Sequence, residues 1–271
     1  MCDHLTGMLP PLNSWGQSFV TVPFADWEND DSFRVLASED ATNIEINGVF
    51  EVTLNRGEFF ETILTGSSTV ESTAPVLLAQ FMQGNAAVGP QFAGDLAMMI
   101  IPPREQFLGD YTVSTPTSGF ISNYLNLVVD GNGLETIALD GLPIPPGAFS
   151  PILGTNFNFA QLEVELGTYS LTCNTAFGVF VYGTNNENSY AYPGGQLYSD
   201  VIEVNDLTLL PQTSEAPLFT ELCFDATLSN IFGEPLEGVR IDFTVQGANE
   251  VSGFVFYRCE WCCYYLLYRR E

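Results

Sequence analysis

Hydrophobic and polar residues alternate with a period of two along much of the chain. The alternation is clear in 42–46 and 162–166, where apolar side chains point to one face and polar ones to the other. Continuous apolar runs at 76–79 and 177–182 predict central strands that are covered on both faces. A period near 3.6 does not persist for three turns, and Gly and Pro interrupt the chain at short intervals. The pattern therefore predicts an all-β protein.

One order of strand and turn segments occurs twice, at about 15–100 and again at about 108–195. Asn47-Gly48 and Asp140-Gly141 hold the same place in the two copies, each between β-rich segments. Both predict tight hairpins, because the two central residues of a type I′ turn need positive φ. We therefore expect two repeated β-sandwich-like units of antiparallel sheet.

The repeat also predicts how the two units superpose. Asn47-Gly48 is expected to fall on Asp140-Gly141, and Ala79-Gln80-Phe81 on Val181-Tyr182-Gly183. In the same comparison, the segment 54–59 corresponds to 166–170. Different strand orders in the two units would contradict a common ancestry.

The sequence changes character after the second copy. We expect a first domain over 1–200, a short polar linker over 201–213 and a second domain over 214–271. Alternating segments at 222–228 and 239–245 flank a Gly- and Pro-containing turn, which is typical of an immunoglobulin-like sandwich. We expect this sandwich to be incomplete.

Composition narrows the possible partners. The chain has 271 residues, 46% of them hydrophobic, which is enough for a sizeable core. It carries 33 Asp and Glu against 7 Lys and Arg, a formal net charge of −26. Such a charge repels nucleic acid and anionic lipid, so neither is an expected partner. The chain contains no run of about 18 apolar residues, so no direct membrane insertion is expected. The segment after Met1 lacks the charged and apolar regions of a signal peptide, so we do not expect it to be one.

The acidic residues offer two candidate calcium loops. Asp30 and Asp31, with Glu28 nearby, form the first, and Asp130, Asn132 and Glu135 form the second. These oxygen ligands suit weak calcium binding, although neither loop matches an EF-hand. Asp, Asn and Gly are also the common turn formers, so solvated turns are the competing interpretation. We expect no cofactor other than this calcium.

Catalytic groups are sparse in the sequence. His4 is the only histidine and has no base partner or metal set around it. Glu163 and Glu165 lie on one predicted strand face, whereas a retaining glycosidase needs carboxylates about 5 Å apart from different elements. The six cysteines lack the spacing of a zinc ribbon. We therefore predict that the protein is not an enzyme, and a carbohydrate-active enzyme is the least favoured alternative.

Several separated motifs resemble those of one family. They are Cys2-Asp3-His4-Leu5, Leu9-Pro10-Pro11, Trp15-Gly16, 75–81, 102–107, 123–126 and Tyr192-Pro193-Gly194-Gly195. Together they resemble the IgGFc-binding protein N-terminal domain family over about residues 2–200. That family consists largely of secreted or surface proteins of bacteria and animals, and it is named for a mucosal protein that binds the Fc part of immunoglobulin G.

The resemblance implies an extracellular binding or adhesion module of a larger secreted or cell-surface protein, with a protein or glycan as its ligand. The alternative is a structural spacer or a self-assembling component of a surface layer or filament. No binding residues of the family can be carried over to this chain.

The segment 221–256 is similar to bacterial immunoglobulin-like repeats of the invasin and intimin kind, but the tail 257–271 departs from them. Those repeats usually continue with a Thr-Asp-x-Asn-Gly turn and an Ala-x-x-Cys-Tyr strand. Back-translation of the tail, read one nucleotide out of frame, restores that continuation. We therefore hypothesise a frameshift at about Tyr257, which would make Cys259, Cys262 and Cys263 accidental and leave Cys223 without its partner. Sequencing across codon 257 tests this.

Overall fold

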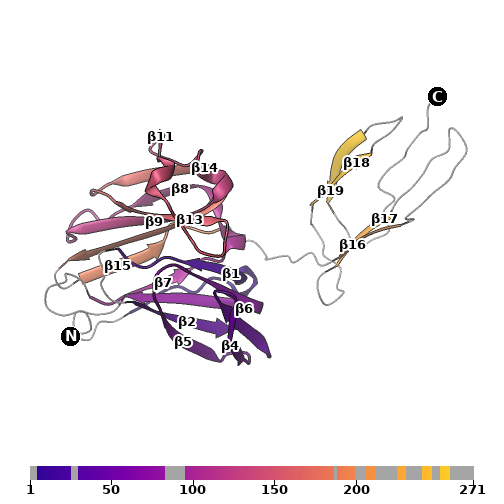
Figure 1. Cartoon of the computed structure of the whole chain (residues 1–271), viewed down its shortest axis with the longest axis horizontal. Coiled ribbons are helices and arrows are strands. Elements are labelled where there is room, and N and C mark those ends of the chain that lie inside the picture. Colours follow the sequence, from indigo (N-terminus) through magenta and orange to yellow (C-terminus); the bar gives the residue numbers. More distant parts are fainter. Residues whose placement is uncertain are drawn as a thin grey trace, which may run out of the picture. The chain divides into compact units, whose positions relative to one another are not determined.

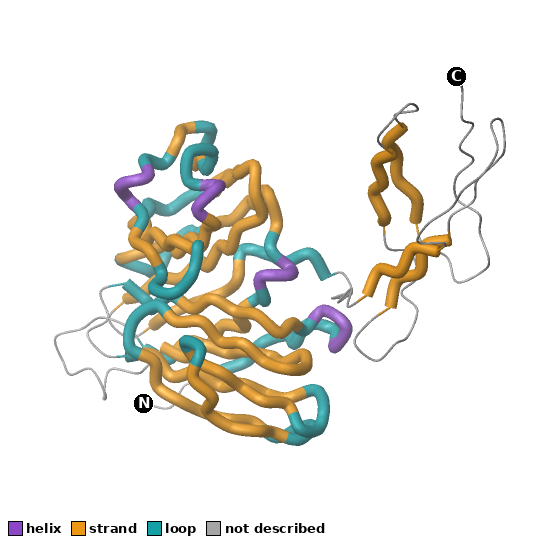
Figure 2. Tube along the Cα trace, turned by 45° about the vertical axis from the view of Figure 1, so that its right-hand side comes forward, coloured by secondary structure: helices purple, strands orange, loops and turns teal. Residues whose placement is uncertain are grey.

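A computed structural model describes most of the first two hundred residues and four strands beyond them (Figures 1 and 2). The described residues are 5–25, 30–82, 95–185, 188–198, 206–210, 225–229, 240–245 and 251–256. The chain divides into two compact units, Met1–Val201 and Ile202–Glu271. Among the described residues there are strands and short 3-10 helices and no α-helix, so the protein is all-β, as the sequence predicts.

The first repeat is a curled antiparallel sheet of seven strands, in the order β4-β3-β6-β2-β5 with β1 and β7 also paired to β6. Its elements are η1 (Leu12–Ser14), β1 (Gly16–Thr21), β2 (Asp31–Ala37), β3 (Thr42–Ile46), β4 (Val49–Leu54), β5 (Phe59–Leu64), β6 (Ser68–Met82) and β7 (Ala97–Ile101).

The second repeat is a sheet of eight strands, in the order β11-β10-β14-β9-β13-β12 with β8 and β15 also paired to β14. Its elements are η2 (Arg104–Gln106), β8 (Leu108–Ser114), β9 (Ser122–Asp130), η3 (Gly131–Gly133), β10 (Ala138–Leu139), β11 (Leu142–Pro143), η4 (Pro146–Ala148), β12 (Ser150–Pro151), β13 (Phe157–Glu163), β14 (Thr168–Asn185) and β15 (Asn188–Pro193).

One long strand makes each sheet into a sandwich-like unit. The first half of β6 lies between β1 and β3, and its second half lies between β2 and β7. In the second repeat the first half of β14 lies between β8 and β10, and its second half lies between β9 and β15. Each long strand therefore belongs to two layers, and apolar side chains fill the space between them.

The strand pairing follows the same register in both repeats. Across the β1–β6 bulge, Gly16 lies opposite Val76, and across the β8–β14 bulge Leu108 lies opposite Phe177. On the other side of each bulge, the next paired residues are Ser18 with Glu71 and Asp110 with Thr172. The bulge therefore shifts the strand register by the same number of residues in both repeats. Each of the seven strands of the first sheet thus has a counterpart in the second sheet, which contains β12 in addition.

The hairpin turns correspond as well. Asn47 and Gly48 have φ of 51° and 74°, and Asp140 and Gly141 have φ of 50° and 76°. These positive values confirm the predicted turns. The Asn47 N–H donates to the carbonyl of Thr69, whose own N–H donates to Asn47 Oδ1. Asp140 exchanges the same two hydrogen bonds with Ser170.

Two details of the predicted superposition are wrong. Since Val76 and Phe177 hold the same place after the bulge, Ala79 corresponds to Phe180 and not to Val181. A continuous apolar run carries no alternation, so the sequence did not mark its register. The segment 54–59 ends β4 and begins β5, whereas 166–170 leads into β14, so those segments do not correspond.

The repeated pattern also begins earlier than residue 15. Pro10-Pro11 precedes η1 as Pro102-Pro103 precedes η2. The turns are closed alike, by Ser14 N–H to the Pro11 carbonyl and by Gln106 N–H to the Pro103 carbonyl, each at 3.0 Å.

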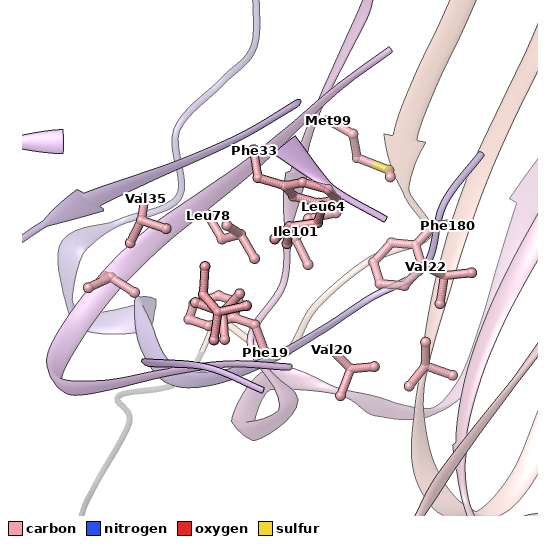
Figure 3. Close-up of a cluster of buried hydrophobic side chains, with 14 of the residues drawn as sticks. Phe19, Val20, Val22, Phe33, Val35, Leu64, Leu78, Met99, Ile101 and Phe180 are labelled. Carbon is pink, nitrogen blue, oxygen red and sulfur yellow. The ribbon is translucent and has the colours of Figure 1, made fainter. Parts of the chain in front are cut away.

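Buried side chains form two clusters. One fills the second repeat, around Leu125, Phe177 and Val181. The other fills the first repeat and continues onto one face of the second, where it includes Phe180 and Tyr182. Figure 3 shows part of it, with Val22 beside Phe180 and Phe33, Leu78 and Ile101 further into the first repeat. The two repeats therefore share a hydrophobic interface.

Beyond residue 201 the structure describes two pairs of strands. β16 (Asp206–Leu210) pairs with β17 (Asp225–Ser229), and β18 (Arg240–Val245) pairs with β19 (Val251–Phe256). Cys223 and the tail 257–271 lie outside the described residues. The immunoglobulin-like assignment and the frameshift stay predictions.

Candidate functional site

The segment Val22–Ala25, which we call the connector, follows β1 and lies between the two repeats. Its backbone is held from both sides. From the first repeat, Gln80 Nε2 donates to the Val22 carbonyl at 2.9 Å, and Asp31 Oδ2 accepts from the Phe24 N–H at 3.0 Å.

From the second repeat, Asn126 Nδ2 and Gln161 Nε2 both donate to the Pro23 carbonyl, at 2.9 and 2.8 Å. The Tyr182 hydroxyl accepts from the Ala25 N–H at 2.7 Å and donates to Asn126 Oδ1. The Phe24 ring packs edge-on against the Tyr182 ring, with centroids 4.8 Å apart. One sheet face of the second repeat thus binds a segment of chain that belongs to no strand or helix.

The first predicted calcium loop is divided between surface and core. Asp30 accepts a hydrogen bond from Thr65 Oγ1 at 2.9 Å. Asp31 is 1% exposed, and its Oδ2 also accepts from Gln80 Nε2 at 2.7 Å. Its Oδ1 is buried without a hydrogen-bond partner. Burial raises the pKa of Asp31 to about 7, against the lowering effect of its two donors. Glu28 lies outside the described residues.

The second predicted calcium loop is a turn closed on itself. Asp130 Oδ1 accepts from the backbone N–H and the side-chain amide of Asn132, at 2.9 and 2.7 Å. Its Oδ2 accepts from Asn156 Nδ2 at 2.9 Å. These hydrogen bonds, led by the backbone donor, lower the pKa of Asp130. Glu135 is exposed.

The structure therefore does not bring the predicted residues into one cluster. In the part of the chain that it describes, no group of three or more His, Cys, Asp or Glu side chains is placed to share a metal ion. Calcium binding at either loop stays a prediction. Glu163 and Glu165 are both exposed, and His4 lies outside the described residues.

A second sheet face, on the first repeat, is left partly exposed. We call it the outer face. It is made by the side chains on β5, β2, β6 and β7 that point away from the core. They are those of Ser32, Arg34, Leu36, Phe59, Glu61, Ile63, Leu77, Ala79, Phe81, Met98 and Ile100. Phe59 is 55% exposed and Ile63 is 60% exposed. Arg34 and Glu61 are the only charged residues in this set.

Arg34 occupies the middle of the outer face. Its guanidinium carbon lies 4.7 Å from the centroid of the Phe59 ring and 5.4 Å from that of the Phe81 ring. Its Nε and Nη2 donate to one oxygen of Glu61, at 3.1 and 2.6 Å. Arg34 is 45% exposed and keeps further N–H groups for a ligand. Stacked arginine and exposed aromatic side chains are typical of protein-binding sites.

A surface depression of about 620 Å³ lies elsewhere on the first repeat, lined by Leu12, Asn13, Trp15, Ser38, Glu39, Arg56 and Pro75. Trp15 is 9% exposed and donates from Nε1 to the Pro10 carbonyl. Glu39 is the only carboxylate in this lining, so no second carboxylate is present to act as its partner in acid–base catalysis. The depression is a place to bind a small group and lacks the paired acids of a glycosidase.

Sequence reasoning missed the outer face and the connector. The signal was present in 59–64, where Phe59, Glu61 and Ile63 alternate with Phe60, Thr62 and Leu64. Both faces of that strand carry apolar residues, whereas an edge strand with one face in solvent usually carries polar residues on that face. The connector gave no signal, because its role depends on residues more than a hundred positions away.

The first unit of the chain thus consists of two repeated β-sandwich-like parts, one of which has a partly exposed face with aromatic and arginine side chains. The family model described as "IgGFc binding protein" matches residues 1–183. The chain belongs to this family, which is a family of binding proteins and indicates an extracellular binding module.

Comparisons with curated proteins and with solved structures do not identify a relative of known function. No curated protein matches the sequence. Among solved structures, that of a putative beta-galactosidase from Bacteroides fragilis matches with 11% identity over 82% of this chain. The chain spans 35% of that protein, and the TM-score of 0.17 carries no argument on fold or activity. No helix among the described residues is long and apolar enough to cross a membrane.

Proposed function

We infer that this protein is a non-catalytic binding and adhesion module of a larger secreted or cell-surface protein, and that it binds a protein partner through the outer face. The observation that carries this inference is Arg34, stacked between Phe59 and Phe81 in the middle of an apolar sheet face. Arginine and aromatic residues contribute most to binding in protein interfaces.

The choice of a protein over a glycan rests on the composition of the face. Sugar ligands need several convergent hydrogen-bonding groups beside an aromatic ring. The outer face instead offers mainly aliphatic and aromatic side chains around one ion pair. That mixture matches the apolar centre of a protein–protein interface.

The experiment is an array of extracellular proteins and glycans, including the Fc and Fab fragments of immunoglobulin G because the family description names Fc. We expect saturable binding to at least one protein by the full chain. Binding to glycans alone, glycan hydrolysis above blank, or ordered self-assembly without a ligand would contradict the proposed function. The last result would favour the spacer or filament alternative.

A further inference from the structure

The second repeat shows what a face like the outer face can bind. Position by position, strands β5, β2, β6 and β7 of the first repeat correspond to β13, β9, β14 and β15 of the second. The side chains that point away from the core of the second repeat include Asn126, Gln161, Phe180 and Tyr182. Those residues hold the connector, and Asn126 is only 1% exposed beneath it.

The central positions of the two faces match. Arg34 lies opposite Glu61 and Ala79, as Asn126 lies opposite Gln161 and Phe180. Asn126 and Gln161, which donate to the Pro23 carbonyl in the second repeat, therefore correspond to Arg34 and Glu61 in the first repeat. A guanidinium is a stronger donor to a carbonyl than an amide, because its charge assists the hydrogen bond.

The apolar positions match as well. Phe81 corresponds to Tyr182, whose ring packs against Phe24 of the connector, and Phe59 corresponds to Phe159. Leu36 corresponds to Val128, which is fully buried in the interface between the repeats. At the centre of the face that binds the connector, Asn126, Phe180 and Tyr182 are buried, whereas Arg34 at the centre of the outer face is 45% exposed.

We propose that the outer face of the first repeat binds a short, proline-containing apolar segment of a partner protein, as the equivalent face of the second repeat binds Val22–Ala25. Arg34 donates to a backbone carbonyl of the segment, and an aromatic side chain of the segment packs on Phe81. With a formal net charge of −26 on the chain, segments without acidic residues are preferred. This inference rests on the proposed function and names the part of the partner that is recognised.

The test uses the full chain labelled with ¹⁵N and, as its probe, a capped peptide with the sequence of residues 20–25, Val-Thr-Val-Pro-Phe-Ala. We expect saturable shifts, with a millimolar Kd, in amide resonances of β5, β2 and β6. Ile63→Asp and Arg34→Ala should each weaken binding at least tenfold. Val49→Asp is the matched control, because Val49 has the same 60% exposure as Ile63 but starts β4 in the other layer.

No shifts up to the solubility limit of the peptide, or shifts confined to the Trp15 depression or to Tyr182, would overturn the inference. Sedimentation that shows a dimer lost in Ile63→Asp would assign the face to a second copy instead. If the array finds a protein partner whose binding Ile63→Asp weakens while the peptide causes no shifts in β5, β2 and β6, the proposed function stands and this inference fails.

Discussion

At Asp31, burial opposes ionisation while two N–H donors favour it, and burial has the larger effect. The pKa is about 7 in the folded protein and 3.8 in an exposed aspartate. Well below pH 3.8 both states are protonated and the contribution to stability is complete. Between pH 4 and 7 only the unfolded chain releases the proton, so the free energy of unfolding falls as pH rises, by on the order of 4 kcal/mol at most.

Asp31→Asn tests this linkage, because the amide resembles the protonated acid and does not titrate. We expect the variant to lose less stability than the wild type between pH 4 and 7, measured by urea unfolding at several pH values. Asp110→Asn, at an exposed position of β8, should leave the pH dependence unchanged. Parallel curves for Asp31→Asn and the wild type would mean that Asp31 ionises normally in the fold.

Tyr182 is a second residue with a defined structural role. Tyr182→Phe removes the hydroxyl and leaves the Ala25 N–H and Asn126 Oδ1 without it. We expect a loss of roughly 1–3 kcal/mol in the free energy of unfolding, the usual cost of unsatisfied buried polar groups. Tyr169→Phe is the control, since its hydroxyl bonds the Glu165 carbonyl at an exposed site. Equal losses in the two variants would contradict the connector's role.

At the scale of elements, close packing joins Phe107, the residue that follows η2, to β14. A Cβ added at Gly178 would lie 2.6 Å from the Phe107 ring, whereas one added at Gly109 would meet its nearest atom at 3.6 Å. Gly178→Ala should therefore destabilise the protein by roughly 1–3 kcal/mol through overpacking, and Gly109→Ala should be tolerated. Thermal unfolding of the two variants measures this. A Gly178→Ala protein as stable as Gly109→Ala would show that the two elements are not closely packed.

The elements differ in how well the sequence predicted them. The Asn-Gly and Asp-Gly hairpins were predictable, because positive φ at both central residues restricts the residue types that fit. The superposition of 79–81 failed by one residue, because a strand buried on both faces has no alternation to fix its register. The outer face and the connector were not predictable, since Asn126 and Gln161 acquire their roles only when distant strands meet.

At the scale of the whole molecule, the excess of carboxylates makes calcium a testable ligand. The sequence predicts weak binding at the Asp30-Asp31 and Asp130–Glu135 loops, and an ion bound only by the folded state would raise the melting midpoint. At Asp130 the ion must displace the amide donors of Asn132 and Asn156. We expect any rise to appear at millimolar calcium in fixed sodium chloride, where the change in screening is small, and to be reduced in Asp130→Asn. An unchanged midpoint would identify both loops as ordinary turns.

The central claim is that this family member binds a protein through the outer face of its first repeat. The most direct measurement compares the wild type, Ile63→Asp and Val49→Asp on one array of extracellular proteins and glycans. We expect a protein ligand that the wild type and Val49→Asp bind alike and that Ile63→Asp binds at least tenfold more weakly. Equal binding by all three proteins, or no protein ligand at all, would contradict it.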